Sequence, residues 1–442
     1  MRNIRNIKSI KKGKVLLISN SFPPVNDSHT RRVEYIVKCL DKFGWDVDVL
    51  TVNPPKNLPY VDFCSVNNVP PNISIFRSYA GIISDMYYMF KPKTKDFPIC
   101  NTKHIQNKMS LKNVQIFISK LINVPLLFDW YPFATINGIK ITKKYDYNVI
   151  ISSGSPVNHL VAYSINKIRD LYWVADFGDP WVFEPTYKDQ SSKIKFLIDL
   201  WLEKCILKSV NKLCVTTEET KQNYLKNYSF IDDNKILVIP MGVDYNFFNT
   251  IRPEYSEKFR ILYTGTISSI RNVIPFLESL KLIKKNLELR KNIEVLFVGS
   301  IGNEYKEIIR NENLEDIISF GGFVSYERSL SLMKGANLLI SFGNKGGLQI
   351  PGKLFDYVAS KTPFLWIKEQ ENDPALPYIK NLNRCIIVDN ICEDLYSTIT
   401  MVYNLYNSNY IESTFDLETL IPEFSWDKRI ENLDTLLSEF IK

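Results

Sequence analysis

Short runs of apolar residues alternate with longer amphipathic stretches along the whole chain. In the first half the apolar runs are VLLISN (15–20), VDVLTV (47–52), NVIISS (148–153) and WVADF (173–177). Helical periodicity covers the residues near 30–43 and 157–169. Continuous apolar runs of this length indicate strands that are buried on both faces, as in a parallel sheet covered by helices.

The second half repeats the same alternation. Its apolar runs are RILYTG (260–265), IEVLFVGS (293–300), IISFGGF (317–323) and LLISFG (338–343), with helical patterns over 272–286 and 326–334. Two such sets of strands and helices predict two α/β domains, each with its own parallel sheet. We place the boundary near Thr250, just after residues 241–244.

The composition fits this picture. The chain has 442 residues, of which 45% are hydrophobic and 23% charged, as expected for two globular domains. No apolar run approaches the roughly eighteen residues of a membrane-spanning helix. The basic start MRNIRNIKSIKKGK has no apolar core and does not resemble a secretory signal. The seven cysteines lack metal-binding spacing, which favours a reducing, cytoplasmic compartment.

The positive charge is concentrated in the first half. Residues 1–250 hold 33 Lys and Arg against 22 Asp and Glu, whereas residues 251–442 hold 22 against 26, which together give the net charge of +7. A basic amphipathic helix near 108–122 could rest on a membrane interface or face a lipid-linked acceptor, and ordinary core with a solvated back is the alternative. Peripheral contact with an anionic membrane and an ordinary lysine-rich, solvated surface both account for the charge asymmetry. Nucleic acid is not expected as a partner, because the lysines are scattered and no recognition motif appears.

The segment IPGKLFDYVASKTPFLW (350–366) begins with Pro and Gly, continues as a helical pattern and ends in a short apolar strand. Asp356 lies in the first turns of the expected helix. Backbone N–H groups at a helix start can hold a diphosphate, and a nearby carboxylate can accept hydrogen bonds from ribose hydroxyls. The segment therefore predicts a pocket for a nucleotide sugar. A favourable charge near a helix start is the alternative explanation of Asp356.

The order and spacing of several segments resemble the family 4 glycosyltransferases, which are retaining enzymes of the GT-B fold. One segment, DFGDPW (176–181), is similar to the Asp-Phe-Arg-Asp-Pro-Trp motif of a subgroup, with Gly178 in place of the Arg. The other segments that carry the resemblance are 14–52, 145–160, 202–220, 236–248, 259–272, 293–300, the Asp356 helix and 424–433.

The resemblance implies an α/β chain of the GT-B class, with two Rossmann-like domains whose parallel sheets face a central cleft. Residues 1–250 would form the acceptor-binding domain, and residues 251–425 the nucleotide-sugar-binding domain. The last helix, 426–442, would pack back on the N-terminal domain.

The resemblance also implies a donor site made of Gly265, Thr266, Arg271, Gly346, Gly347, Leu348, Lys353 and Asp356. Arg271 would grip the diphosphate, and Lys353 would supply a second positive charge; both are candidate catalytic residues because the leaving phosphate gains negative charge. Thr266 stands where the family usually has an Arg, and Leu348 where it has a first acidic residue. The alternative for Arg271 is a surface position at a helix start.

The acceptor site would comprise Asp27, Ser28, His29, Asp176 and Asp179. The first loop has Asn26-Asp27-Ser28 where the family usually has two glycines, and Arg31 or Arg32 could neutralise the donor's charge. Asp179 is the candidate for acceptor positioning or general base. A helix cap by Ser28 or Thr30, and a turn stabilised by the two aspartates of DFGDPW, are the structural alternatives. The three histidines, of which His29 could face the cleft, make no metal set.

The resemblance therefore implies a glycosyltransferase of hexosyltransferase type that needs no metal and no cofactor. The expected donor is a UDP-sugar, and GDP- and ADP-sugars are the alternatives. The expected acceptor is a saccharide or a lipid-linked glycan of surface polysaccharide synthesis. A GT-B sugar-nucleotide epimerase and a non-catalytic GT-B partner protein remain alternatives; Gly178 and Leu348 favour the latter. A nicotinamide enzyme is disfavoured, because 14–52 has no GxGxxG motif.

Overall fold

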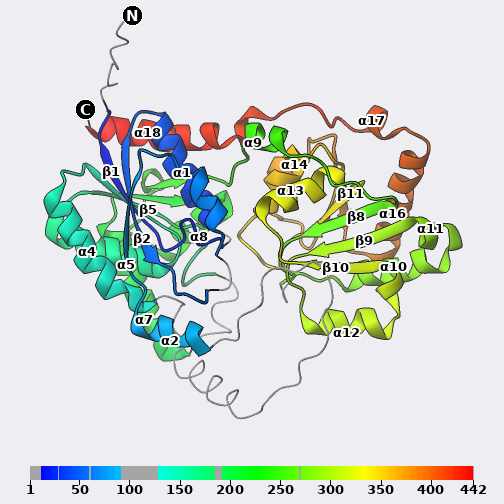
Figure 1. The fold of residues 1–442 in the computed structure, drawn as a ribbon, viewed down its shortest axis with the longest axis horizontal. Helices are drawn as coiled ribbons and strands as arrows, with labels where there is room; N and C mark the ends of the chain where they lie inside the picture. The colour runs from blue at the N-terminus through cyan, green and yellow to red at the C-terminus, as the bar shows by residue number, and fades with distance from the viewer. Residues whose placement is uncertain are drawn as a thin grey trace, which may run out of the picture. The chain divides into compact units, whose positions relative to one another are not determined.

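The computed structural model describes residues 11–27, 29–58, 61–90, 128–184, 192–267 and 270–441 (Figure 1). These residues form two compact units. The first unit takes in the described residues up to Thr216, those from Thr220 to Pro240, and the C-terminal stretch from Trp426. The second takes in Thr217–Glu219 and Met241–Ser425. The chain thus passes into the second unit at 240–241, ahead of the Thr250 that the sequence pattern favours.

The first unit is built on a seven-stranded parallel sheet of order β3-β2-β1-β4-β5-β6-β7. The strands are β1 (Lys14–Ile18), β2 (Asp46–Asn53), β3 (Ser74–Tyr79), β4 (Val149–Ser153), β5 (Tyr172–Asp176), β6 (Lys212–Val215) and β7 (Ile236–Val238). The helices are α1 (Thr30–Lys42), α2 (Ile82–Phe90), α4 (Tyr131–Lys144), α5 (Pro156–Arg169), α7 (Lys193–Ser209), α8 (Glu218–Asn227) and α18 (Trp426–Ile441), with short 3₁₀ turns at Phe63–Asn68, Phe128–Trp130 and Asp233–Lys235.

The second unit is built on a six-stranded parallel sheet of order β10-β9-β8-β11-β12-β13. The strands are β8 (Phe259–Thr264), β9 (Ile293–Val298), β10 (Ile318–Gly322), β11 (Leu338–Phe342), β12 (Phe364–Lys368) and β13 (Cys385–Asp389). The helices are α9 (Tyr245–Thr250), α10 (Ile274–Lys285), α11 (Leu287–Asn292), α12 (Asn303–Asn311), α13 (Tyr326–Gly335), α14 (Lys353–Ala359), α15 (Leu376–Ile379), α16 (Cys392–Asn407) and α17 (Ile411–Thr414), with 3₁₀ turns at Leu314–Asp316 and Pro422–Phe424.

The apolar runs become the central strands because both faces of each sheet are covered. Val15, Leu16, Leu17 and Ile18 of β1 are all fully buried, and Val15 pairs with residues of both β2 and β4. A strand with helices on both faces has no exposed side, so alternation of apolar and polar positions is absent. The prediction of two α/β units with parallel sheets is confirmed.

The last helix, α18, packs against α1 of the first unit. The rings of Tyr35 and Trp426 stack with their centroids 5.1 Å apart. The indole N–H of Trp45 donates to Asp434 Oδ1 at 2.8 Å. The C-terminal stretch is therefore part of the first unit's core, although the whole second unit precedes it in the sequence.

Two sequence-based expectations lie outside the described residues, namely Ser28 and the amphipathic helix near 108–122. Within the part of the chain that the structure describes, none of the helices is long and apolar enough to cross a membrane.

Candidate functional site

Each sheet has one point at which the strand order reverses. In the first unit this switch point lies between β1 and β4, and in the second unit between β8 and β11. Open α/β sheets bind ligands at the carboxyl ends of the strands, outside such a switch point. The loops that follow these four strands carry most of the residues that the sequence points to.

A buried ion pair lies at this edge of the first sheet. Arg32, on α1, donates from Nε to Asp176 Oδ2 at 2.9 Å and from Nη2 to Asp176 Oδ1 at 2.6 Å, and its Nη1 donates to the carbonyl of Ile239 at 2.8 Å. Burial raises the pKa of Asp176, but the Arg32 guanidinium outweighs burial and holds this pKa below its usual value. Asp176 is therefore a carboxylate fixed within the protein.

His29 is joined to this ion pair through Ser153, the last residue of β4. Ser153 Oγ donates to Asp176 Oδ2 at 2.5 Å, and His29 Nε2 lies 2.9 Å from the same Oγ. Burial lowers the pKa of His29, against the opposing effect of Asp176. Because His29 follows β1 and Ser153 ends β4, their hydrogen bond crosses the switch point of the first unit.

Asp27 holds the loop that carries His29. Its Oδ1 accepts from the backbone N–H of His29 at 3.0 Å and of Thr30 at 2.9 Å, and its Oδ2 accepts from Ser21 Oγ at 2.6 Å. Thr30 Oγ1 in turn accepts from the backbone N–H of Asp27 at 3.2 Å. Asp27 therefore caps the start of α1, and the side chain of Thr30 accepts a hydrogen bond from the backbone of Asp27.

Asp179, the remaining predicted acceptor residue, and His159, which was not in the predicted acceptor set, occupy different environments. Asp179 is exposed, three residues beyond β5. His159 is fully buried, stacks on Phe177 with centroids 4.0 Å apart, and donates from Nε2 to the carbonyl of Gly154 at 3.1 Å. Burial lowers the pKa of His159 to about 3, so it is a neutral packing residue. Ser153 is absent from the sequence-based set; its place at the carboxyl end of an apolar run is the signal that could have found it.

Arg271 crosses the switch point of the second unit. It follows β8, and its Nε donates to Asn344 Oδ1, in the loop after β11, at 3.1 Å. Its Nη1 donates to Tyr263 OH at 2.7 Å and to the carbonyl of Thr266. The hydroxyl of Tyr305 donates to the backbone carbonyl of Arg271 at 3.0 Å. The guanidinium is therefore held in one place at the carboxyl ends of β8 and β11.

The α14 segment places Lys353 and Asp356 together. Lys353 Nζ donates to Asp356 Oδ2 at 3.2 Å, and Tyr326 OH donates to Asp356 Oδ1 at 2.8 Å. Lys353 Nζ also lies 4.8 Å from the centroid of the Tyr326 ring. Asp356 is only 7% exposed, so both of its carboxylate oxygens have protein partners and little contact with solvent.

The remaining predicted donor residues lie in the loops after β8 and β11. Gly265 has φ of 141° and Gly346 has φ of 63°, which are conformations that residues with a Cβ rarely adopt. Thr266 and Gly346 are exposed, and Gly347 and Leu348 are half-buried. These two loops carry Arg271 and Asn344. Gly265 and Leu348 lie in the same loops and have no charged side chain.

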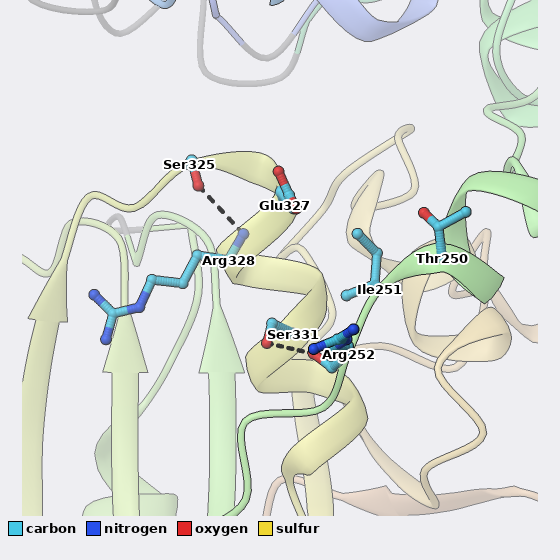
Figure 2. A pocket seen from close by; sticks show the side chains of 7 residues that line it. All are labelled: Thr250, Ile251, Arg252, Ser325, Glu327, Arg328 and Ser331. Carbon is cyan, nitrogen blue, oxygen red and sulfur yellow. Dashed lines mark hydrogen bonds between the residues drawn. The ribbon is translucent and has the colours of Figure 1, made fainter. Parts of the chain in front are cut away.

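Figure 2 shows a pocket of the second unit lined by Thr250, Ile251, Arg252, Ser325, Glu327, Arg328 and Ser331. Arg328 extends away from Thr250 and Ile251 in this view and pairs with Glu254 at 3.3 Å. None of the donor-site or acceptor-site residues predicted from the sequence lines this pocket. Among the residues that the structure describes, no group of three or more His, Cys, Asp or Glu side chains is arranged to hold a metal ion.

No protein-family model matches the chain. An uncharacterized glycosyltransferase of Methanocaldococcus jannaschii is 19% identical over 334 residues, which cover 70% of this chain and 81% of the relative.

Solved structures of low sequence identity share the fold over nearly the whole chain. A glycosyltransferase from Rickettsia africae is 18% identical with a TM-score of 0.60, and the match covers 98% of this chain and 100% of that one. TarM of S. aureus, in complex with fondaparinux, α-GlcNAc-glycerol and UDP, is 11% identical with a TM-score of 0.62 over 96% and 99% of the two chains. A UDP-N-acetylglucosamine 2-epimerase-like protein of Listeria monocytogenes is 11% identical with a TM-score of 0.55 over 98% and 97%. The two parallel-sheet units of this chain therefore have the GT-B fold.

Proposed function

We propose that this protein is a glycosyltransferase that moves a sugar from a nucleotide-sugar donor to a saccharide or lipid-linked acceptor. The observation that carries the proposal is the guanidinium of Arg271, held across the β8–β11 switch point by Tyr263 and Asn344. A fixed cation at the carboxyl ends of parallel strands suits the diphosphate of such a donor. The sequence similarity to an archaeal glycosyltransferase and the GT-B fold support the same reaction class.

In the proposed reaction Arg271 stabilises the nucleotide diphosphate as it leaves. Breaking the bond between the sugar and the β-phosphate places negative charge on the phosphate, and a positioned cation stabilises that charge more in the transition state than in the bound donor. Lys353, held by Asp356, would add a second positive charge. A contact between Asp356 and the ribose of the donor stays a prediction that rests on the family resemblance. In the structure, the two oxygens of Asp356 accept hydrogen bonds from Lys353 and Tyr326.

The finer features of the reaction follow the resemblance. We place the acceptor on the first unit, beside His29 and Asp179, and we expect retention at the anomeric carbon with the leaving phosphate assisting attack from the same face. We expect UDP-sugars to be the best donors, as one similar structure holds UDP. Transfer should need no divalent metal, so that EDTA leaves it intact; activity lost in EDTA and restored by Mg²⁺ or Mn²⁺ would contradict this.

Donor binding gives the first test. We expect at least one sugar nucleotide among UDP-, GDP- and ADP-sugars to raise the unfolding temperature, because a ligand at a hundred times its Kd adds about 2.7 kcal/mol to the stability of the state that binds it. The shift should disappear in Arg271→Ala and persist in Arg310→Ala, a control on α12 whose side chain is 71% exposed. No shift with any donor would refute the proposal. Incubation with the binding donor alone, followed by product analysis, separates transfer from epimerisation.

We also propose that the first unit contacts a membrane surface through α7. Ile194, Leu197, Ile198 and Trp201 lie three, one and three residues apart, on one face of this helix, and they are 73%, 63%, 52% and 64% exposed. Lys193 and Lys204 lie on the same helix. A helix with an apolar face that includes Trp and with lysines beside it is typical of segments that lie in the membrane interface.

Vesicle binding tests this contact. The protein should float with vesicles that contain anionic phospholipid, and the double variant Leu197→Ser/Trp201→Ser should bind at least tenfold more weakly, because it removes apolar surface from the exposed face of α7. Leu287→Ser, which changes an 81% exposed leucine of the second unit, is the matched control and should bind as the wild type does. Equal binding of the double variant and the control would show that α7 does not make the contact.

A further inference from the structure

The ring of His29 fills a space that two glycines leave open. A Cβ added to Gly178 would lie 2.5 Å from His29 Cε1 and 2.6 Å from Nδ1, and one added to Gly154 would lie 2.7 Å from Cδ2. Real Cβ atoms do not approach other atoms so closely. Gly154 also has φ of 101°, a conformation that favours glycine, whereas Gly178 is not in the left-handed region. At position 178, therefore, it is the histidine ring that excludes a side chain.

The hydrogen bonds of Ser153 determine which nitrogen of His29 carries the proton. Ser153 has a single hydroxyl proton, and it is donated to the Asp176 carboxylate. Ser153 Oγ can then only accept from His29 Nε2, so Nε2 carries the ring proton. A neutral ring with its proton on Nε2 has a free lone pair on Nδ1. Among the described residues, none donates a hydrogen bond to Nδ1.

The charges around His29 favour this neutral form. Asp176 and Asp179, from β5 and the loop after it, and Asp27, from its own loop, favour the charged ring, whereas Arg32 on α1 and burial disfavour it. His159 on α5 also interacts with it. Burial is the largest of these effects, and it lowers the pKa of His29. His29 as a residue is half-buried.

We propose that His29 is an acceptor-binding residue whose Nδ1 atom accepts a hydrogen bond from a hydroxyl group of the sugar acceptor. The inference rests on the proposed sugar transfer and adds an atom and a protonation state to it. Asp27 holds the backbone of His29, while Ser153, Asp176 and Arg32 hold its ring and tautomer. Gly178, which departs from the subgroup motif, is in this account the residue that makes room for the ring.

Two isosteric substitutions separate the two ring nitrogens. In His29→Asn the amide oxygen can take the place of Nδ1, whereas in His29→Gln the amide can take the place of Nε2 and no atom replaces Nδ1. We expect His29→Gln to raise the KM for the acceptor at least tenfold and leave donor binding unchanged, with His29→Asn closer to the wild type. Acidification that protonates the ring should raise the acceptor KM of the wild type only. A wild-type KM in His29→Gln would overturn the inference.

A double-mutant cycle tests the role of Gly178. Gly178→Ala should raise the acceptor KM as much as His29→Ala does, because the methyl group displaces the ring. In the His29→Ala background the same change should have no further effect, since no ring remains to be displaced. An additional loss in the double variant would show that Gly178 acts independently of His29. Unfolding temperatures measured in parallel identify any variant that has simply lost stability.

A spectroscopic measurement keeps this inference separate from the proposed function. Imidazole ¹⁵N chemical shifts, assigned with His29→Gln, should show His29 neutral at pH 7 with its proton on Nε2. Gly178→Ala should change these shifts. A ring that is charged, or that carries its proton on Nδ1, overturns the inference even if the protein transfers sugar. The expected tautomer without binding of any sugar nucleotide would instead contradict the proposed donor.

Discussion

Replacing Arg271 with alanine should lower the rate of sugar transfer by about 10²–10³-fold at saturating donor, the range typical for removal of one group that stabilises charge in a transition state. The effect should be large because the guanidinium is already held by Tyr263, Thr266 and Asn344, so little reorganisation is needed when the phosphate gains charge. The measurement is kcat with labelled donor, together with donor Kd.

The controls for this experiment separate charge from geometry. Arg271→Lys keeps the charge but cannot hold the bonds to Tyr263 and Asn344 together, so its rate should fall between those of the wild type and the alanine variant. Arg310→Ala removes an exposed cation of the same unit and should leave kcat unchanged. A kcat for Arg271→Ala within threefold of the wild type would remove Arg271 from the proposed chemistry.

The second large effect concerns stability. Arg32→Met should lower the free energy of unfolding of the first unit by about 3–5 kcal/mol, because it leaves the Asp176 carboxylate buried without its partner. Since the folded protein holds the pKa of Asp176 below its usual value, the stability from this pair is fully present above about pH 4 and is lost as the pH falls. Urea unfolding of the wild type and the variant at pH 7 provides the measurement.

A matched ion pair on the surface provides the comparison. Lys42 and Asp427 lie 2.5 Å apart but are 62% and 46% exposed, so Lys42→Met should change stability by less than about 1 kcal/mol. The double variant Arg32→Met/Asp176→Leu should recover part of the loss, because no buried charge is then left alone. If Arg32→Met were as stable as Lys42→Met, the Arg32–Asp176 pair would not hold the edge of the sheet.

The fold was predictable because buried parallel strands leave a strong local signal. The run 15–20 becomes β1 (Lys14–Ile18), and the run 338–343 becomes β11 (Leu338–Phe342), with differences only at the ends. Such strands can be predicted from the local sequence alone, since burial on both faces makes each strand continuously apolar.

The details of the site depend on neighbours that are distant in the sequence. Asn344 is 73 residues from Arg271, and Ser153 is 124 residues from His29. Only the order of the strands brings these pairs together, so no local pattern indicates them. Gly178 shows the same limit: the sequence presents it as a missing arginine, whereas the structure places the ring of His29 beside it. Asp356 is the converse case, because its helical position was predicted but its burial and its bond to Tyr326 were not.

Apart from Thr217–Glu219, which also belong to the second unit, the chain passes into that unit at 240–241 and leaves it after Ser425, and its final 16-residue helix completes the first unit. A single proteolytic cut between residues 240 and 241 would therefore produce a fragment that carries the second unit, except Thr217–Glu219, together with α18. That fragment would stay attached to the other by the stacking of Trp426 on Tyr35 and the bond from Trp45 to Asp434. Conversely, a gene shortened to its first 240 codons would leave the surface under α18 uncovered, so the two halves cannot be separated cleanly by dividing the sequence in the middle.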